Sequence, residues 1–156
     1  TYNGDHMSSY GVNAGVPKTL VKYLVVYEAE RLGKNSKAAQ STLEAILNTD
    51  ISPELLPPED GKIAQKTEEI LGKYDLLDFV IYYYVRYGFS RDKIEFLLRA
   101  AWGGAGEEQI QKSLDTFYKR FFAAQFKRSC LPDGVKIGSV SFSPRSDFRL
   151  PSDIGS

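Results

Sequence analysis

The side chains that nucleophilic or metal chemistry needs are scarce in this sequence. Its 156 residues include one cysteine, Cys130, and one histidine, His6, far apart along the chain. A Cys–His pair is geometrically possible, but lone residues seldom form one, so packing roles are favoured for both. One residue of each kind excludes an internal disulfide and a metal site built on several cysteines or histidines. We therefore expect no catalytic residue and no metal ligand in this chain.

Loops and helix starts that bind phosphate are the next kind of site to consider. The pattern Gly-x-x-x-x-Gly-Lys-Ser/Thr does not occur. The stretch Gly103-Gly104-Ala105-Gly106 is rich in glycine, but no strand is expected before it, so an inter-helix turn is favoured. Ser52, just before Pro53, could bind an anion through its hydroxyl and the free backbone N–H groups of a helix start. Plain N-capping is the alternative for Ser52, and the residues alone favour it.

Cations gather toward the end of the chain. The whole sequence is neutral, with 20 Lys+Arg and 20 Asp+Glu, whereas residues 112–156 hold 8 of the former and 4 of the latter. Lys127 and Arg128 fall at the end of an expected helix, where they could simply complement its dipole. Alternatively, one of them binds a phosphate or a carboxylate. Residues that would suit the same anionic ligand follow them, namely Lys136, Ser139, Ser141, Ser143, Arg145 and Arg149.

Composition excludes several classes of protein. The apolar share is 42% and the charged share 26%, which is ordinary for one globular domain. The longest apolar run, 79–85, is far shorter than the roughly 20 residues of a membrane span, and the basic tail is too sparse for a nucleic-acid binder. The single cysteine and the absence of a visible leader favour the cytoplasm. The opening Thr1–Asp5, without Met, looks like the middle of a domain, so we expect a piece of a longer chain.

Helices are expected to position these residues. Apolar spacing predicts helices over 17–33, 36–47, 74–87 and 107–126, another that Ser90 caps, and short ones after Ser52 and Thr67. The 74–87 stretch is apolar almost all round, which predicts a central helix rather than a base-stacking platform. Two apolar stripes are clear, one formed by Ile94, Leu97, Leu98 and Ala101, the other by Ile110, Leu114, Phe117, Phe121 and Ala124.

A three-part, mainly α layout follows from this spacing. Residues 1–16 are expected to be a loop, 17–126 a helical region and 127–156 an extended basic tail. One run in the tail, 137–142, alternates apolar and polar residues, as a strand would. Little other sheet is expected.

Several stretches, taken in their order along the chain, resemble glutamine-dependent NAD(+) synthetases. They are 12–20 (VNAGVPKTL), 51–57 (ISPELLP), 75–79 (DLLDF), 86–90 (RYGFS), 125–129 (QFKRS), 131–134 (LPDG), 143–145 (SPR) and 151–153 (PSD). Each stretch is weak by itself, but the ordered set covers nearly the whole chain and is specific. Ser146 and Phe148 depart from the pattern, since they stand where the family usually has Gly and Trp.

The resemblance implies a fold and an activity. The chain would be the helical C-terminal portion of an α/β adenine-nucleotide alpha-hydrolase-like synthetase domain. The parent enzyme would be an ATP-dependent ligase that uses ATP and Mg²⁺ to adenylate the nicotinate carboxylate of deamido-NAD. Ammonia would arrive from glutamine through a tunnel from a separate nitrilase-like domain and displace AMP. Synthetase units of the family pair, so a homo-oligomer is implied.

The resemblance also assigns binding residues. Thr1 and Tyr2 match the end of the loop that contacts deamido-NAD, and Lys127 matches a lysine that binds the same substrate. Ser52 corresponds to a loop near the ATP phosphates. Asp5 and His6 lie near the substrate loop, with packing or capping roles equally open.

Other parts of the family's machinery are absent from this sequence. It lacks the Ser-Gly-Gly-x-Asp-Ser ATP loop, the magnesium-binding acids and the glutaminase Cys-Glu-Lys triad, and Cys130 does not match that nucleophile. The chain alone is therefore expected to bind neither ATP nor Mg²⁺ and to be inactive. A second hypothesis, from another class, is a helical interaction or oligomerisation module without catalysis, which the tyrosine-rich 74–87 stretch supports.

Overall fold

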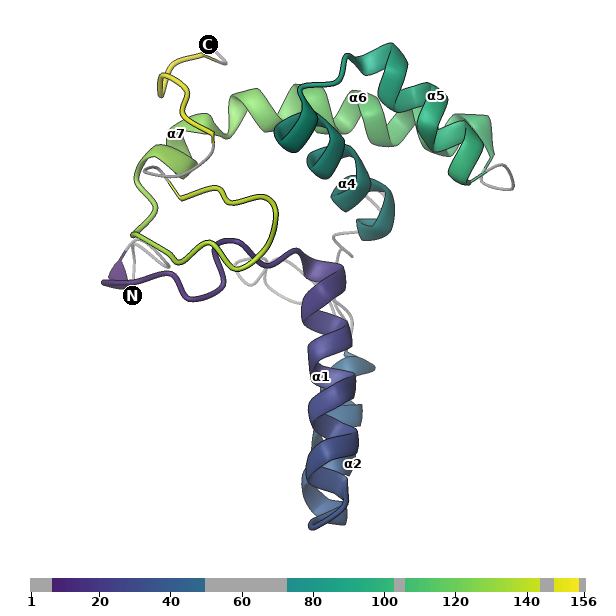
Figure 1. Ribbon diagram of the computed structural model, residues 1–156, viewed down its shortest axis with the longest axis vertical. Coiled ribbons are helices and arrows are strands. Elements are labelled where there is room, and N and C mark those ends of the chain that lie inside the picture. The colour runs from purple at the N-terminus through teal and green to yellow at the C-terminus, as the bar shows by residue number, and fades with distance from the viewer. Residues whose placement is uncertain (1–6, 50–72, 103–105, 144–147, 155–156) are drawn as a thin grey trace, which may run out of the picture. The chain divides into compact units, whose positions relative to one another are not determined.

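The computed structural model describes residues 7–49, 73–102, 106–143 and 148–154, and the regular elements in these ranges are all helices. This confirms the mainly α prediction (Figure 1). By its internal contacts the chain divides into two compact units, Pro17–Tyr74 and a second that joins Thr1–Val16 to Asp75–Ser156. None of the described helices combines the length and apolar character needed to cross a membrane. The predicted division into 1–16, 17–126 and 127–156 stays a prediction.

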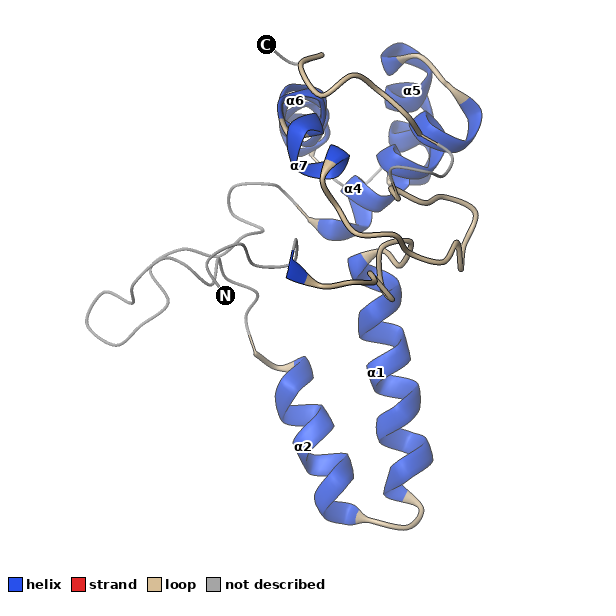
Figure 2. Ribbon diagram, turned by 90° about the vertical axis from the view of Figure 1, so that its left-hand side faces the viewer, coloured by secondary structure: helices blue, strands red, loops and turns tan. Residues whose placement is uncertain are grey.

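The first unit contains a helical hairpin (Figure 2). Its helices α1, Lys18–Gly33, and α2, Lys37–Leu47, pack against each other. Pro17, with φ −66°, directly precedes α1, and the Ser36 hydroxyl accepts a hydrogen bond from the Ala39 amide at 3.2 Å. Both helix starts are therefore confirmed to within a residue. Among the described residues of this unit, Ala29 alone is fully buried.

The core of the second unit lies between α5, Arg91–Ala101, and α6, Glu107–Ala123. Ser90 caps α5 as predicted, because its hydroxyl accepts a hydrogen bond from the Lys93 amide at 3.4 Å. Most of the two predicted stripes is buried, namely Ile94, Leu98, Ile110, Leu114, Phe117 and Phe121. Leu97 is half-buried, and Ala101 is exposed because α5 ends there.

The predicted central helix over 74–87 is only partly correct. Its first half, α4 (Tyr74–Ile81), buries Leu76, Leu77 and Val80, but Tyr82–Arg86 forms the π-helix η2, whose wider turns shift the apolar face. Tyr84 turns inward, with the Phe117 and Phe121 rings at centroid distances of 5.8 and 5.5 Å, and burial raises its pKa. By contrast, Tyr82 and Tyr87 are exposed and contact each other, with their ring centroids 5.5 Å apart.

The predicted last helix, 107–126, is interrupted. The α6 helix ends at Ala123, Ala124 leaves helical geometry with φ −91° and ψ 7°, and a short helix, α7, spans Gln125–Ser129. At the break, the Arg128 side chain donates a hydrogen bond to the Phe121 carbonyl, the group to which a continuous helix would direct the Gln125 amide. Residues 131–143 form no strand, so the alternating run 137–142 did not predict one correctly; its Ile137 is exposed while Ser141 is buried.

Leu98 and Phe96 provide a matched pair for testing the core. Leu98 is completely buried, whereas Phe96, two residues earlier on α5, is 69% exposed. We expect Leu98→Ala to lower the free energy of unfolding by about 2–5 kcal/mol, because it leaves a cavity between α5 and α6. Phe96→Ala should change that free energy by less than about 1 kcal/mol. Urea unfolding followed by circular dichroism checks both values, and equal losses would contradict this placement of the core.

Candidate functional site

The structure places only part of the predicted site. Thr1, Tyr2 and Ser52 lie outside the described residues, as do Asp5 and His6. Within the described ranges, no group of three or more His, Cys, Asp or Glu side chains is arranged to hold a metal ion. Lys127, the remaining residue assigned to the substrate, is described and is the starting point for the site.

Lys127 lies on the outer side of α7, a helix of five residues. Its side chain is exposed, and its Nζ lies 5.7 Å from the ring centroid of Phe126, which is itself 57% exposed. Lys127 belongs to the last turn of α7, where the backbone carbonyls favour a cation. The result is an accessible cation beside an exposed aromatic ring, a combination that suits an anionic ligand with an aromatic part.

Arg128, the other candidate for binding an anion, points inward instead. Its Nη2 donates a hydrogen bond to the Phe121 carbonyl in the last turn of α6, and its Nε donates to the Gln125 side-chain oxygen at 3.0 Å. The guanidinium carbon also lies 4.1 Å from the Phe121 ring centroid, and burial lowers the pKa of Arg128. These contacts separate the two neighbouring cations, because Lys127 faces solvent while Arg128 is bound within the protein.

The Gln125 side chain connects α7 to the tail. Gln125 is 4% exposed, and its Nε2 donates to the Leu150 carbonyl, 25 residues later, at 3.1 Å. Phe148 packs beside this bond, with its ring centroid 5.3 Å from that of Phe121. The tail is therefore held against the junction of α6 and α7.

The opening segment is also close to the tail. The Gly11 amide donates to the Asp133 carbonyl at 2.6 Å, and Gly15 is buried against the backbone of residues 135–140. At Gly134 a Cβ atom would collide with the Gly11 carbonyl, so glycine is required for the close approach of the two backbones. Two segments more than a hundred residues apart thus meet in one unit, the same unit that carries Lys127.

The polar residues predicted along the tail do not form a single surface. Ser141 and Ser143 are buried, and the Ser143 amide donates to the Ser141 hydroxyl at 3.4 Å, so both belong to the local packing. Ser139, Lys136 and Arg149 are exposed. Arg145 lies outside the described residues.

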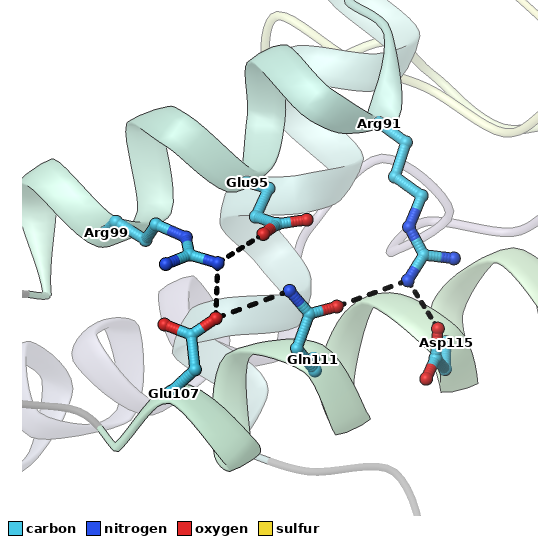
Figure 3. A network of polar contacts seen from close by, with 6 residues as sticks. All are labelled: Arg91, Glu95, Arg99, Glu107, Gln111 and Asp115. Carbon is cyan, nitrogen blue, oxygen red and sulfur yellow. Dashed lines mark hydrogen bonds and ion pairs between the residues drawn. The ribbon is translucent and has the colours of Figure 1, made fainter.

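Polar contacts between α5 and α6 were not predicted from the sequence (Figure 3). Arg99 contacts Glu95 at 2.6 Å and also pairs with Glu107, and the pKa of Glu95 is lowered mainly by its hydrogen bond from Arg99. Arg91 pairs with Asp115 at the other end of the network. The i,i+4 spacing of Glu95 and Arg99 was a usable sequence signal, whereas the contacts between helices had none. These exposed and partly exposed groups connect the two helices through side-chain contacts.

Gln125 begins α7, and Cys130 directly follows its last residue. The spacing gave one hint of the structural role of Gln125, since it follows the buried Phe121 by four residues on the same apolar face. The exposed Cys130 thiol lies 3.3 Å from the carbonyls of Phe126 and Lys127, at the end of the helix. The structure therefore gives Cys130 a local contact with the last carbonyls of α7.

Comparison with known proteins relates the chain to one family. No family model matches it. A glutamine-dependent NAD(+) synthetase of Mycobacterium leprae (strain TN) is 38% identical over 170 residues, which cover 97% of this chain. The proteins of the same name from Mycobacterium bovis and Mycobacterium tuberculosis are 37% identical over the same share. The chain spans 25% of the length of these curated relatives. Nearly the whole of this chain therefore corresponds to one segment of the glutamine-dependent NAD(+) synthetase family.

Proposed function

We propose that this chain is the C-terminal part of the synthetase domain of an ATP-dependent ligase that amidates deamido-NAD to NAD, using ammonia derived from glutamine. The observation that carries the proposal is the 38% identity across 97% of the chain to a protein named glutamine-dependent NAD(+) synthetase. The mainly helical structure agrees with a helical portion of a larger α/β adenine-nucleotide alpha-hydrolase-like domain. Catalytic residues would lie on other parts of the enzyme.

The chemistry of such a ligase explains why a cation is needed here. A carboxylate is a poor acyl electrophile, and adenylation by ATP gives it a leaving group that ammonia can displace. Deamido-NAD itself carries a pyrophosphate and a carboxylate, so it must be held by positive charges and N–H donors. Lys127 is exposed, and Phe126 beside it offers a ring that could stack on a nucleotide.

The remaining components follow from the same proposal. Thr1 and Tyr2 would contact deamido-NAD together with Lys127, and the pairing of Gly11 with Asp133 supports this by bringing the opening segment to the tail. Ser52 would lie in a loop near the ATP phosphates. ATP and Mg²⁺ would be bound by the rest of the enzyme, which would work in the cytoplasm without nucleic-acid or membrane partners.

Replacing Lys127 tests its proposed contact with the substrate. In the full-length enzyme that carries this chain, Lys127→Ala should raise the KM for deamido-NAD about 10- to 100-fold, because one charge-assisted hydrogen bond is lost. The melting temperature should barely change, since the Lys127 side chain is exposed. Lys119→Ala is the control: Lys119 is also exposed but lies on α6, and its replacement should leave KM unaltered. Parallel losses of stability and activity in Lys127→Ala would favour a structural role instead.

A second test asks whether the isolated chain can catalyse the reaction without the rest of the enzyme. The isolated 156-residue chain should form no NAD when it is supplied with deamido-NAD, ATP, Mg²⁺ and ammonia, because its sequence lacks the ATP loop of the family. Chromatographic assay of NAD measures this, with the full-length enzyme as the positive control. Turnover by the isolated chain would refute the proposal that the ATP-binding chemistry lies elsewhere.

A second candidate function is homo-oligomerisation through α1. The exposed residues Leu20, Tyr23, Leu24 and Tyr27 are spaced i, i+3, i+4 and i+7, so they share one face of that helix. Antiparallel pairing of two copies would set Leu20 opposite Tyr27 and Tyr23 opposite Leu24, as a two-fold interface requires. The sequence pointed to the tyrosine-rich 74–87 stretch for such a role, but that stretch buries Leu76, Leu77 and Val80, whereas α1 exposes a full apolar face.

A charge introduced on the exposed face of α1 tests whether that face joins two copies of the chain. Leu24→Glu should shift the sedimentation coefficient of the protein toward that of a smaller species, because a carboxylate would be buried between two apolar faces. Ser41→Glu, at an exposed position of α2, should leave it unchanged. An unaltered assembly in both variants would rule out α1 as the contact between copies.

A further inference from the structure

The contacts of α7 divide its residues into two groups. Gln125 is buried, and Arg128 and Ser129 are partly buried, whereas Phe126 and Lys127 are exposed. Residues at i, i+3 and i+4 share one helix face, so the inward group lies on one side and the two outward residues on the other. The direction of Lys127 is therefore set by whatever holds the inward face in place.

Beyond the amide hydrogen bonds of Lys127 and Arg128 to the Ala124 carbonyl, at 3.1 and 3.4 Å, the inward face is held by side chains. A helix of five residues has almost no stability of its own, and the break at Ala124 uncouples α7 from the continuous backbone ladder of α6. Arg128 supplies the link back to α6, through its hydrogen bond to the Phe121 carbonyl and its position 4.1 Å from the Phe121 ring centroid. The orientation of α7 on α6 thus depends heavily on one guanidinium group.

Gln125 extends this link to the tail. Its side-chain oxygen accepts from Arg128 Nε at 3.0 Å, and its Nε2 donates to the Leu150 carbonyl at 3.1 Å. A buried amide that bridges two such partners fixes both, because leaving either of its groups unpaired would be costly. We call the bonded set Phe121 carbonyl, Arg128, Gln125 and Leu150 carbonyl the latch.

We propose that Arg128 and Gln125 are positioning residues, which hold Lys127 where it meets deamido-NAD and do not touch that substrate themselves. This inference rests on the proposed function and adds a role for the two residues beside Lys127. Arg128 is partly buried, and a paired charge of this kind contributes little net stability, whereas its fixed geometry can specify one conformation. The latch therefore acts mainly on the position of the neighbouring lysine.

The latch itself is tested by hydrogen–deuterium exchange without substrate. In the full-length enzyme, Arg128→Met should speed amide exchange in the peptides that contain α7 and residues 148–150, because the guanidinium link to α6 is lost. Gln125→Met, which removes the amide without touching a charge, should give the same pattern. Arg120→Met, at an exposed arginine in the last turn of α6, is the control and should leave exchange in these peptides unchanged. Unchanged exchange in both latch variants would overturn the latch.

A double-mutant cycle then tests the action on Lys127. Arg128→Met should raise the KM for deamido-NAD about tenfold with a smaller change in kcat, and the double variant with Lys127→Ala should match Lys127→Ala alone within about twofold. Multiplying effects would show that Arg128 acts independently of Lys127, and a loss confined to kcat or to stability would show a merely structural role; either result overturns the inference. If Lys127→Ala leaves KM unchanged, the proposed contact with the substrate fails, and with it the proposed role of the latch.

Discussion

The guanidinium of Arg128 is the contact on which the junction of α6, α7 and the tail depends. A cation removed from water needs acceptors, and the last carbonyls of a helix need donors because the helix itself provides none. The Phe121 carbonyl and the Arg128 guanidinium meet both needs at once. This pairing accompanies the break at Ala124, where the one long predicted helix is divided into α6 and α7. Directly after the break, the Gln125 side chain donates a hydrogen bond to the Leu150 carbonyl and so holds the tail.

Much of the fold could be predicted because burial follows periodicity. The stripe through Ile110, Leu114, Phe117 and Phe121 is buried as its spacing indicates, and the serine caps at Ser36 and Ser90 mark true helix starts. The break at Ala124 could not be predicted, because alanine is the best helix former and leaves no local signal. The π-helix at Tyr82–Arg86 was equally hidden, since a stretch that is apolar all round fits several helical periods.

For the candidate site, the sequence offered two neighbouring cations, Lys127 and Arg128, and could not choose between them. Composition and helix-end chemistry applied equally to Lys127 and Arg128, and the family resemblance selected Lys127. The structure distinguishes them by direction, because a long side chain can point into the protein or into solvent from almost the same backbone position. Phe148 packs its ring against Phe121, with the two centroids 5.3 Å apart, on the side of α6 where Arg128 is bound.

The two units differ in how far they stabilise themselves. Among the described residues, nine of the ten buried apolar side chains belong to the unit that carries α5 and α6, whereas the α1–α2 hairpin buries Ala29. Two paired helices with one small buried residue remove too little apolar surface from water to offset the entropy of ordering them. The exposed face of Leu20, Tyr23, Leu24 and Tyr27 is the surface available to make up the difference. Among the described residues, therefore, the exposed apolar face of α1 is where further packing would add most to the stability of the hairpin.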